Sequence, residues 1–558
     1  MLIHRRITAG ILAAVLLTPA FGGEEARLRA NWRSLQEKQI DLLPVPKHLN
    51  VLPARRISGI ALSGLPGAKF RTAIIEEIES RLRELESPVR LQCAAEPVAG
   101  AFNIILKPWN GNTEESAKIP FNADSRFEQA YTLSPMENGI VLRGKGDAGL
   151  LYAAVTLRAL IVREGEKIMI HAASVADWPD FAVRRIGLRS ILFGQAKWND
   201  GEQCLLLMKQ ALKWALRNKI NAVAHLPYQP PYGAMRLNAK PPYYSPRAAQ
   251  LMKRITEYAA ANGIAAGRAK GTMTLAWQTN ETDAGDPRFK KLMLYNRGRL
   301  TTWAHPEWFA ETAGRLTEFY KQSGFAFYNF HSVDGGAAND PEFWSRRDDA
   351  TKARFGSDRV QADLAVLREI HRCFQGLNVD FSYSQYPYCG YFLTEEGIRR
   401  TLHLPDTAAA SEYARETAQL NRNYLKRLDR ELAPDISLCF REGTAEEMKT
   451  GYATCPERPL WLYWEVLNIN RDVVPLLSPE IAMTKSAFQS PRKGELKLWL
   501  SDDYEFWEQC KVLFAEFAWN RNFPGNRDFS RKDSPVSYPA DFRRGARAGR
   551  EMGRPYRL

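Results

Sequence analysis

The sequence predicts an α/β protein in which a small α/β domain precedes a TIM barrel, that is, a closed (β/α)8 sheet. Two observations support this fold class. The chain has 558 residues, which is too long for a single hydrophobic core, so two or three domains are expected. From Arg184 onward, short apolar runs alternate with helical stretches, and this alternation is typical of a parallel sheet wound with helices.

Residues 1–23 are typical of a signal peptide. A cationic start is followed by an apolar run at 7–17 and by small residues around Ala20, and the acidic pair Glu24 and Glu25 comes next. The apolar run is much shorter than the roughly 20 residues that span a bilayer, and no other segment reaches that length. We therefore expect a secreted or periplasmic protein without stable membrane insertion. An uncleaved interfacial anchor is the alternative.

Residues 24–180 carry the pattern of one mixed α/β domain. The elements expected in it are, in order, a helix at 24–39, an extended segment at 41–47, a helix at 71–85, strands at 101–106, 131–133 and 139–143, and a helix at 147–160. Pro44 and Pro46 favour extended backbone in the second of these. The third is predicted by apolar residues at three-to-four spacing, and Asp147 is a suitable N-terminal cap for the last helix.

Residues 181–526 are expected to form the barrel, because they contain about eight strand-like runs, the number that closes a TIM barrel. The strands are expected at 184–192, 221–226, 264–270, 325–332, 378–386, 436–441, 460–466 and 495–500. Helices are expected between them, and those at 203–218 and 245–262 have the clearest apolar spacing. The remaining residues, 527–558, are rich in arginine, glycine, serine and proline and are expected to be a disordered basic tail.

Composition limits the partners. Much of the net charge of +14 lies in the signal peptide and the tail, which indicates either a solvated extension or contact with an anionic glycan, membrane or cell wall. The basic segments have no interleaved aromatic residues and no DNA-binding module is present, so no nucleic acid partner is expected. The seven cysteines form no CxxC pair, and neither a glycine-rich phosphate loop nor an HExxH motif occurs. We therefore expect no cofactor and no metal.

Several segments resemble known sugar-cleaving enzymes. The segments at 128–134, 138–144 and 147–158 (EQAYTLS, NGIVLRG and DAGLLYAAVTLR) resemble the N-terminal domain of bacterial β-N-acetylhexosaminidases. The DWPDF segment at 177–181 and the strand after it resemble the barrel entry of glycoside hydrolase families 20 and 84, and FAFYNFHSVD at 325–334 resembles the fourth strand of family 84. The resemblance implies a zincin-like, hexosaminidase-type α/β domain followed by a TIM-barrel glycoside hydrolase domain.

The resemblance also implies substrate-assisted catalysis, an exception to the two-carboxylate scheme in which the 2-acetamido oxygen of the sugar attacks the anomeric carbon. Two adjacent acids at the end of strand four assist the attack. Alignment on Phe330 puts His331 and Ser332 at these positions, so the acid pair is not retained. His331 could donate a proton. Asp334 reaches the acid position if the loop slides by two residues, and the alternative is a turn aspartate before Gly335.

Glu465 ends the seventh predicted strand and is the third catalytic candidate. It is either the partner of Asp334 in a pair of catalytic acids, or a residue that binds sugar hydroxyls, as the family 84 resemblance implies, or purely structural. Substrate-binding candidates at the other strand ends are Tyr386, Arg441, Glu442, Trp464, Asn468 and Trp499. Strand ends also carry packing aromatics and capping groups, which is the structural alternative for each of these residues. The second strand, which ends at His225, lacks the lysine and acids of family 84.

Three functions are consistent with these observations. The first is a glycoside hydrolase with altered catalytic residues that acts on a β-N-acetylhexosaminide or a related glycan. The second is a non-catalytic glycan-binding protein that keeps the pocket without the acids. The third is a barrel used for surface assembly through the basic tail. The first two predict a carbohydrate as the ligand.

Overall fold

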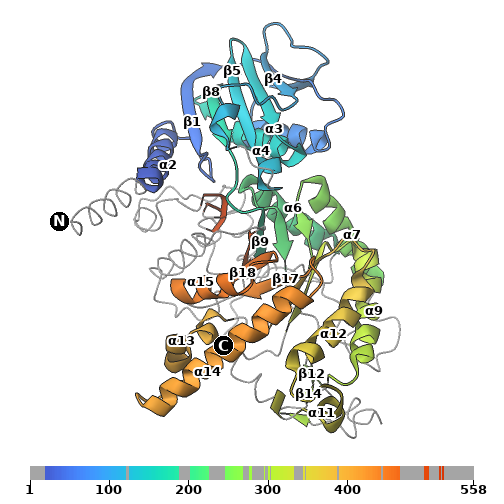
Figure 1. Cartoon of the computed structure of the whole chain (residues 1–558). Coiled ribbons are helices and arrows are strands. Elements are labelled where there is room, and N and C mark those ends of the chain that lie inside the picture. Colours follow the sequence, from blue (N-terminus) through green and yellow to red (C-terminus); the bar gives the residue numbers. More distant parts are fainter. Residues whose placement is uncertain are drawn as a thin grey trace, which may run out of the picture.

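The computed structural model describes most of the chain between residues 19 and 520. The described ranges are 19–120, 125–187, 201–224, 246–267, 276–278, 294–295, 299–301, 303–331, 344–345, 347–385, 387, 389–440, 444–465, 496–501, 514–516 and 518–520. They contain two eight-stranded sheets and a three-stranded sheet. The first eight-stranded sheet lies above the second in Figure 1, and helices lie between the two. Among the described helices, none is both long and apolar enough to cross a membrane.

The first sheet is mixed, with the strand order β1-β8-β5-β6-β4-β2-β3 and β7 paired to β8. Its strands are β1 (His48–Arg56), β2 (Ile60–Ser63), β3 (Leu91–Cys93), β4 (Phe102–Lys107), β5 (Tyr131–Met136), β6 (Gly139–Gly144), β7 (Ile161–Glu164) and β8 (Lys167–Asp177). The strands predicted in this region are confirmed as β4, β5 and β6. The extended segment expected at 41–47 leads into β1.

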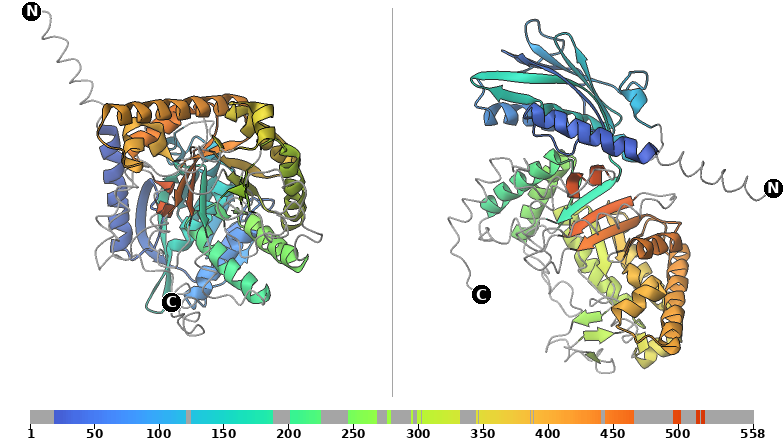
Figure 2. Two further views of the ribbon diagram at one scale, coloured as in Figure 1. Left: turned by 90° about the horizontal axis from the view of Figure 1, so that it is seen from below. Right: turned by 90° about the vertical axis from the view of Figure 1, so that its left-hand side faces the viewer.

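Three helices belong to the same domain as the first sheet: α2 (Pro19–Glu37), α3 (Arg71–Glu84) and α4 (Asp147–Ala159). Helix α4 is buried along nearly its whole length, which explains its almost wholly apolar sequence. The side view in Figure 2 places α2 on the side of the sheet that faces the barrel. All three helices were predicted, although α2 begins at Pro19 rather than at residue 24.

The second sheet is a barrel of parallel strands taken in sequence order. Its strands are β9 (Val183–Gly187), β10 (Ala222–Ala224), β11 (Ala265–Ala266), β15 (Phe327–His331), β16 (Asp380–Ser384), β17 (Ser437–Phe440), β18 (Leu460–Glu465) and β19 (Leu496–Ser501). Each strand pairs in parallel with the next along the chain from β15 to β19, β19 pairs with β9, and β9 continues through β10 to β11. All eight predicted strands are confirmed.

The barrel closes between β11 and β15. The N–H of Ala326 donates a 2.9 Å hydrogen bond to the carbonyl oxygen of Ala266, and the N–H of Asp380 continues the ladder by donating to Ala326. A Cβ at Gly267 would lie 3.2 Å from the backbone N and O of Phe327, so glycine permits the close approach of the two strands. The sheet therefore has no open edge at this point.

Helices connect the barrel strands and surround them, as the view from below in Figure 2 shows. They are α6 (Gly201–Arg217), α7 (Pro246–Ala261), α9 (Pro306–Ser323), α12 (Arg359–Phe374), α14 (Ala408–Glu431) and α15 (Ala445–Thr454). Local signals fix their ends: the Asp358 side chain caps α12, Thr444 and Glu447 form a capping box at α15, and α9 stops at Gly324 in the left-handed conformation. The helices predicted at 203–218 and 245–262 are confirmed as α6 and α7.

The small sheet β12-β14-β13, with β12 (Ala276–Gln278), β13 (Leu294–Tyr295) and β14 (Arg299–Thr301), is antiparallel and lies between β11 and α9 in the chain. Three shorter helices, α11 (Asp349–Phe355), η5 (Gly390–Leu393) and α13 (Glu395–Thr401), are also additions to the barrel pattern. The sequence analysis predicted none of these elements.

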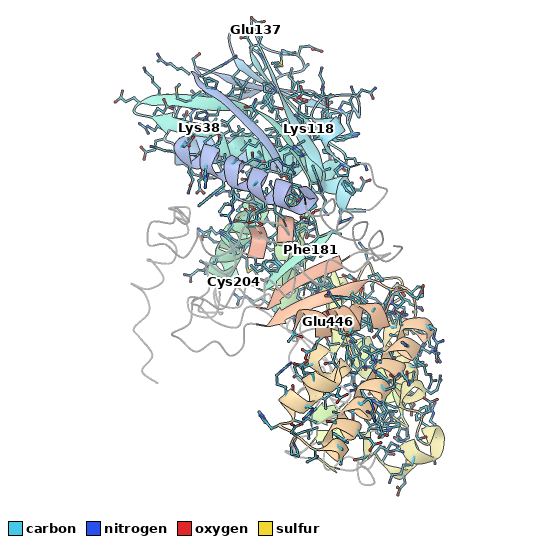
Figure 3. The ribbon with its side chains drawn as sticks, turned by 60° about the vertical axis from the view of Figure 1, so that its left-hand side comes forward. Lys38, Lys118, Glu137, Phe181, Cys204 and Glu446 are labelled. Atoms are coloured by element: carbon cyan, nitrogen blue, oxygen red, sulfur yellow. The ribbon has the colours of Figure 1, made fainter. Side chains whose placement is uncertain are left out.

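A buried polar network joins the two large sheets. Asp177, at the end of β8, accepts hydrogen bonds from Lys219 Nζ at 2.8 Å, from Tyr131 Oη at 2.7 Å and from Trp519 Nε1 at 2.9 Å. Phe181, whose carbonyl accepts a hydrogen bond from Arg184, lies between the first sheet and the barrel (Figure 3). The first sheet and the barrel are therefore linked through charged groups that water does not reach.

A second cluster of charges links α3 to α6. Glu77 is fully buried and lies 2.9 Å from Lys213 Nζ, 3.0 Å from Arg217 Nε and 3.3 Å from Arg158 Nε. Burial raises the pKa of the Glu77 carboxyl, but Arg217, Lys213 and Arg158 outweigh burial, and the net effect is a lowered pKa. The Glu77 carboxylate therefore stays ionised, and its buried negative charge is balanced by the three neighbouring cations.

Candidate active site at the C-terminal rim of the barrel

The eight parallel strands bring their C-terminal ends to one rim of the barrel, and this is where barrel enzymes carry their catalytic groups. His331 is the last residue of β15 and is paired with Ser384 of β16. Glu465 is the last residue of β18 and is paired with Ser501 of β19. The backbones of these two predicted catalytic residues thus reach the same rim, from strands that have β16 and β17 between them.

Two predicted binding residues also lie on described strands. Trp464 precedes Glu465 in β18, and Trp499 lies in β19, two residues before its end. Trp499 is paired with Tyr463 on one side and with Arg185 on the other. These pairings place the backbones of both tryptophans near the rim.

The other candidates lie outside the described residues. They are Asp334, Tyr386, Arg441, Glu442 and Asn468, and Ser332 and His225 also fall there. In the sequence, each of them follows the end of a barrel strand by a few residues. Their roles, and the convergence of the Asp334 and Glu465 carboxyl groups, remain predictions.

Inside the barrel, below the rim, the charged side chain of Arg185 lies between two aromatic rings. The guanidinium carbon of Arg185, on β9, lies 3.6 Å from the ring centroid of Phe327 and 3.8 Å from that of Trp461. A nitrogen of the same guanidinium lies 3.5 Å from Asp380 Oδ2. Burial lowers the pKa of Arg185 to about 10, so the side chain is still charged at neutral pH. The pair of rings supplies the electrostatic attraction that solvent would otherwise provide.

Above Arg185, a layer of neutral polar side chains crosses the barrel from β15 to β17. Asn329 Nδ2 donates to Ser382 Oγ at 3.0 Å and lies 3.5 Å from Cys439 Sγ. Ser384 Oγ donates to Asn329 Oδ1 at 3.1 Å. These four side chains, which we call the polar layer, are all buried. Because they satisfy one another, they fix the strands relative to each other.

Burial raises the pKa of the Cys439 thiol to about 11, although hydrogen bonds from Ser384 and Ser382 and the charge of Arg185 act in the opposite direction. A thiol with this pKa stays neutral near pH 7, and a neutral thiol is a poor nucleophile. The polar layer therefore holds no ionised group of its own.

Gln385 extends the polar contacts up to the rim. Its Nε2 donates to the carbonyl oxygen of Cys439 at 2.8 Å, and its Oε1 accepts from the N–H of Cys439 at 3.1 Å. The side chain is fully buried. A single amide group therefore satisfies both backbone groups that Cys439 turns toward β16.

The polar layer and Gln385 were not predicted from the sequence. One signal was available: Phe327 and Asn329 are two residues apart, as are Ser382 and Ser384, and alternate residues of a strand share one face. Within the described residues, no group of three or more His, Cys, Asp or Glu side chains is arranged to hold a metal ion.

Comparison with known proteins identifies the architecture. A model of glycosyl hydrolase family 20, domain 2, matches residues 40–178. No curated protein matches the sequence. Among solved structures, the chain is similar to the chitobiase of Flavobacterium johnsoniae, with 10% identity over 92% of this chain and 72% of that chain and a TM-score of 0.53.

It is also similar to a β-N-acetylhexosaminidase from Bacteroides fragilis NCTC 9343, with 13% identity over 92% of this chain and 94% of that chain and a TM-score of 0.51. The protein CpGH84D has 15% identity, with 86% of this chain and 69% of that chain covered and a TM-score of 0.50. At such identities the likeness is one of fold. Residues 40–178 thus match the model of glycosyl hydrolase family 20, domain 2, and the chain as a whole has a fold similar to those of solved hexosaminidase structures.

Proposed function

We propose that this protein is a glycoside hydrolase that cleaves a β-linked N-acetylhexosaminide or a related glycan with an altered set of catalytic residues. The observation that carries the proposal is the meeting of β15 and β18 at one rim of a hexosaminidase-like barrel. The end of β15 leads to Asp334 along the chain, and β18 ends at Glu465. Two carboxyl groups that flank a glycosidic bond are the usual requirement for its hydrolysis.

In the proposed mechanism, Asp334 donates a proton to the glycosidic oxygen, and the bond between that oxygen and the anomeric carbon breaks. The 2-acetamido oxygen of the sugar attacks the anomeric carbon, as the family resemblance implies, and water then opens the resulting ring. His331 is the second candidate for the proton donor, since histidine is the commonest general acid among side chains. Glu465 binds sugar hydroxyls or acts as the second acid.

The remaining candidates would form the wall of the sugar site. Trp464, Trp499 and Tyr386 offer aromatic faces to the C–H bonds of a sugar ring, whereas Arg441, Glu442 and Asn468 offer hydrogen bonds to its hydroxyls. We also propose export of the protein, because residues 1–23 have the pattern of a signal peptide. An exported enzyme of this kind would meet its glycan outside the cytoplasm.

The direct test is release of the aglycone from chromogenic sugars. Purified protein is expected to cleave a β-N-acetylglucosaminide faster than the matching β-glucoside, because only the former has the 2-acetamido group. Circular dichroism confirms that the sample is folded. A folded protein that releases no aglycone from any sugar of a broad panel contradicts the hydrolase proposal.

A second candidate function is glycan binding without cleavage. It is favoured by His331, which is the last residue of β15, where the family resemblance places the first of two adjacent acids. Calorimetry with N-acetylglucosamine separates the two functions: binding with no turnover supports the second, and turnover excludes it. Absence of binding to every N-acetylated sugar contradicts both.

A further inference from the structure

The backbone pairing between β16 and β17 stops before β17 ends. The backbone pairing of the two strands comprises Ser382 with Ser437 and Tyr383 with Leu438, and stops there. Strand β17 continues through Cys439 and Phe440, which pair only with β18. The N–H and carbonyl of Cys439 that face β16 would lack partners if nothing replaced the missing backbone.

The side chain of Gln385 replaces that backbone. Its amide both donates to and accepts from Cys439, at 2.8 and 3.1 Å, and Nε2 also lies 3.4 Å from the carbonyl oxygen of Pro387. Beyond the last backbone pair of β16 and β17, the buried Gln385 side chain therefore makes the contact between the two strand ends.

The polar layer connects the ends of β16 and β17 to the end of β15. Asn329, Ser384 and Cys439 contact one another from β15, β16 and β17. Each of them lies two residues before a residue predicted to act in catalysis or binding, namely His331, Tyr386 and Arg441. Displacement of the polar layer would therefore shift the ends of the three strands that lead to these residues along the chain.

We propose that Gln385 is a positioning residue of the sugar site, which sets the separation of the β16 and β17 ends, and that the polar layer sets their height. The proposal rests on the proposed function for its sugar-binding part. Gln385 does not touch the reacting atoms. It acts on the backbone of Cys439 and, through it, on the wall of the site contributed by β16 and β17.

The test compares Gln385→Met, which keeps the side-chain length and removes the amide's hydrogen bonds to Cys439 and Pro387, with the wild type. A matched control is Asn31→Leu, because Asn31 is also a buried amide and donates to the backbone carbonyls of Pro46 and Lys47, at 2.8 and 3.3 Å, in the first domain. Both variants are expected to lower the melting temperature. Only Gln385→Met is expected to alter amide exchange at Cys439 and the affinity for the sugar.

The first readout is hydrogen–deuterium exchange of the peptide that contains Cys439. In Gln385→Met its amide is expected to exchange about tenfold faster, because one hydrogen bond is lost, while Asn31→Leu leaves it unchanged. Unchanged exchange in Gln385→Met overturns the proposal, whether or not the protein acts on sugars. This readout therefore separates the failure of this proposal from the failure of the proposed function.

The second readout is kinetic. Gln385→Met is expected to raise KM for the N-acetylglucosaminide by about tenfold, or Kd by the same factor if the protein only binds. The change in kcat is expected to be smaller, because the substitution shifts the β16 and β17 side of the sugar site and leaves the acid on the β15 side in place. Ser384→Ala, which removes the hydrogen bonds of the Ser384 hydroxyl to Asn329 and Cys439, is expected to act in the same direction by about twofold to threefold. It also serves if Gln385→Met does not fold.

Faster exchange at Cys439 with unchanged KM and Kd overturns the positioning role. A KM effect of equal size in Asn31→Leu does so too, because the effect would then be one of general destabilisation. A wild-type protein that neither cleaves nor binds any N-acetylated sugar overturns the proposed function and, with it, the sugar-binding part of this proposal.

Discussion

Asp177 and Lys219 form an ion pair with 2.8 Å between Oδ2 and Nζ, and both side chains are fully buried. Asp177 ends β8 of the first sheet, whereas Lys219 follows helix α6 of the barrel. Burial lowers the pKa of Lys219, and the Asp177 carboxylate opposes this effect. Tyr131, Trp519 and the backbone N–H of Lys47 also donate hydrogen bonds to the same carboxylate, so its charge is well compensated.

Lys219→Met is expected to destabilise the protein by about 3 kcal/mol or more, because it leaves the Asp177 charge buried without its cation. The control is Lys352→Met, which removes an ion pair of similar length, 2.9 Å, in which Asp349 is 98% exposed. That change is expected to stay within about 0.5 kcal/mol. Chemical denaturation measures both, and equal effects contradict the prediction.

Glu516 is expected to make stability depend on pH. Burial raises the pKa of its carboxyl to about 7, although hydrogen bonds from Asn520 and Val45 favour the charged form. The folded state therefore prefers the protonated acid. The stabilisation from this group is complete below the ordinary pKa of a glutamate and is lost as the pH rises to about 7.

Melting temperatures between pH 4.5 and 8 check this prediction. The difference between the wild type and Glu516→Gln is expected to shift against the wild type as the pH rises, because only the wild type loses a proton here. Glu446→Gln, at a position where the side chain is 77% exposed, is the control and should run parallel to the wild type. A difference that does not change with pH contradicts a raised pKa at Glu516.

Arg185→Lys is expected to destabilise the barrel by about 2 kcal/mol although the charge is kept. The planar guanidinium lies between the rings of Phe327 and Trp461, and an ammonium group cannot contact both faces in this way. Arg372→Lys, where the side chain is 66% exposed, is the control and should leave the free energy of unfolding nearly unchanged. If Arg185→Lys is as stable as the wild type, the two rings do not select for the guanidinium.

Asp334→Asn tests the proposed acid. Loss of a general acid is expected to lower kcat/KM by a factor of about 10² to 10⁴, with little change in melting temperature. Asp349→Asn removes a carboxylate that is almost fully exposed at the start of α11, and should leave both quantities unchanged. Full activity of Asp334→Asn would assign the proton to His331 or Glu465 instead.

The sequence predicted the barrel well because its signal is repetitive. Eight apolar runs, spaced by helices, were enough to give all eight strands in the right order. The first sheet was predicted less completely. β8 is one of its longest strands, yet it was missed, because its burial on both faces removes the alternation that marks a half-exposed strand.

The candidate site could be predicted only in part. His331 and Glu465 could be placed at the rim because each ends a predicted strand, and the C-terminal ends of all parallel strands lie at the same rim. Gln385 and Asn329 could not be found in this way, because their roles depend on which strands become neighbours and on where a ladder stops. These are properties of the closed sheet, and no local pattern encodes them.

The contacts of the last described residues, 514–516 and 518–520, affect the order of folding. Glu516 accepts a hydrogen bond from the N–H of Val45, and Asn520 donates to the carbonyl of Val45 and accepts from Lys47 Nζ. During synthesis from the N-terminus, the first sheet emerges hundreds of residues before these partners exist. Until residues 516–520 have been synthesised, the polar groups of Val45 and Asp177 in the nascent first domain therefore lack the hydrogen bonds that this late segment provides.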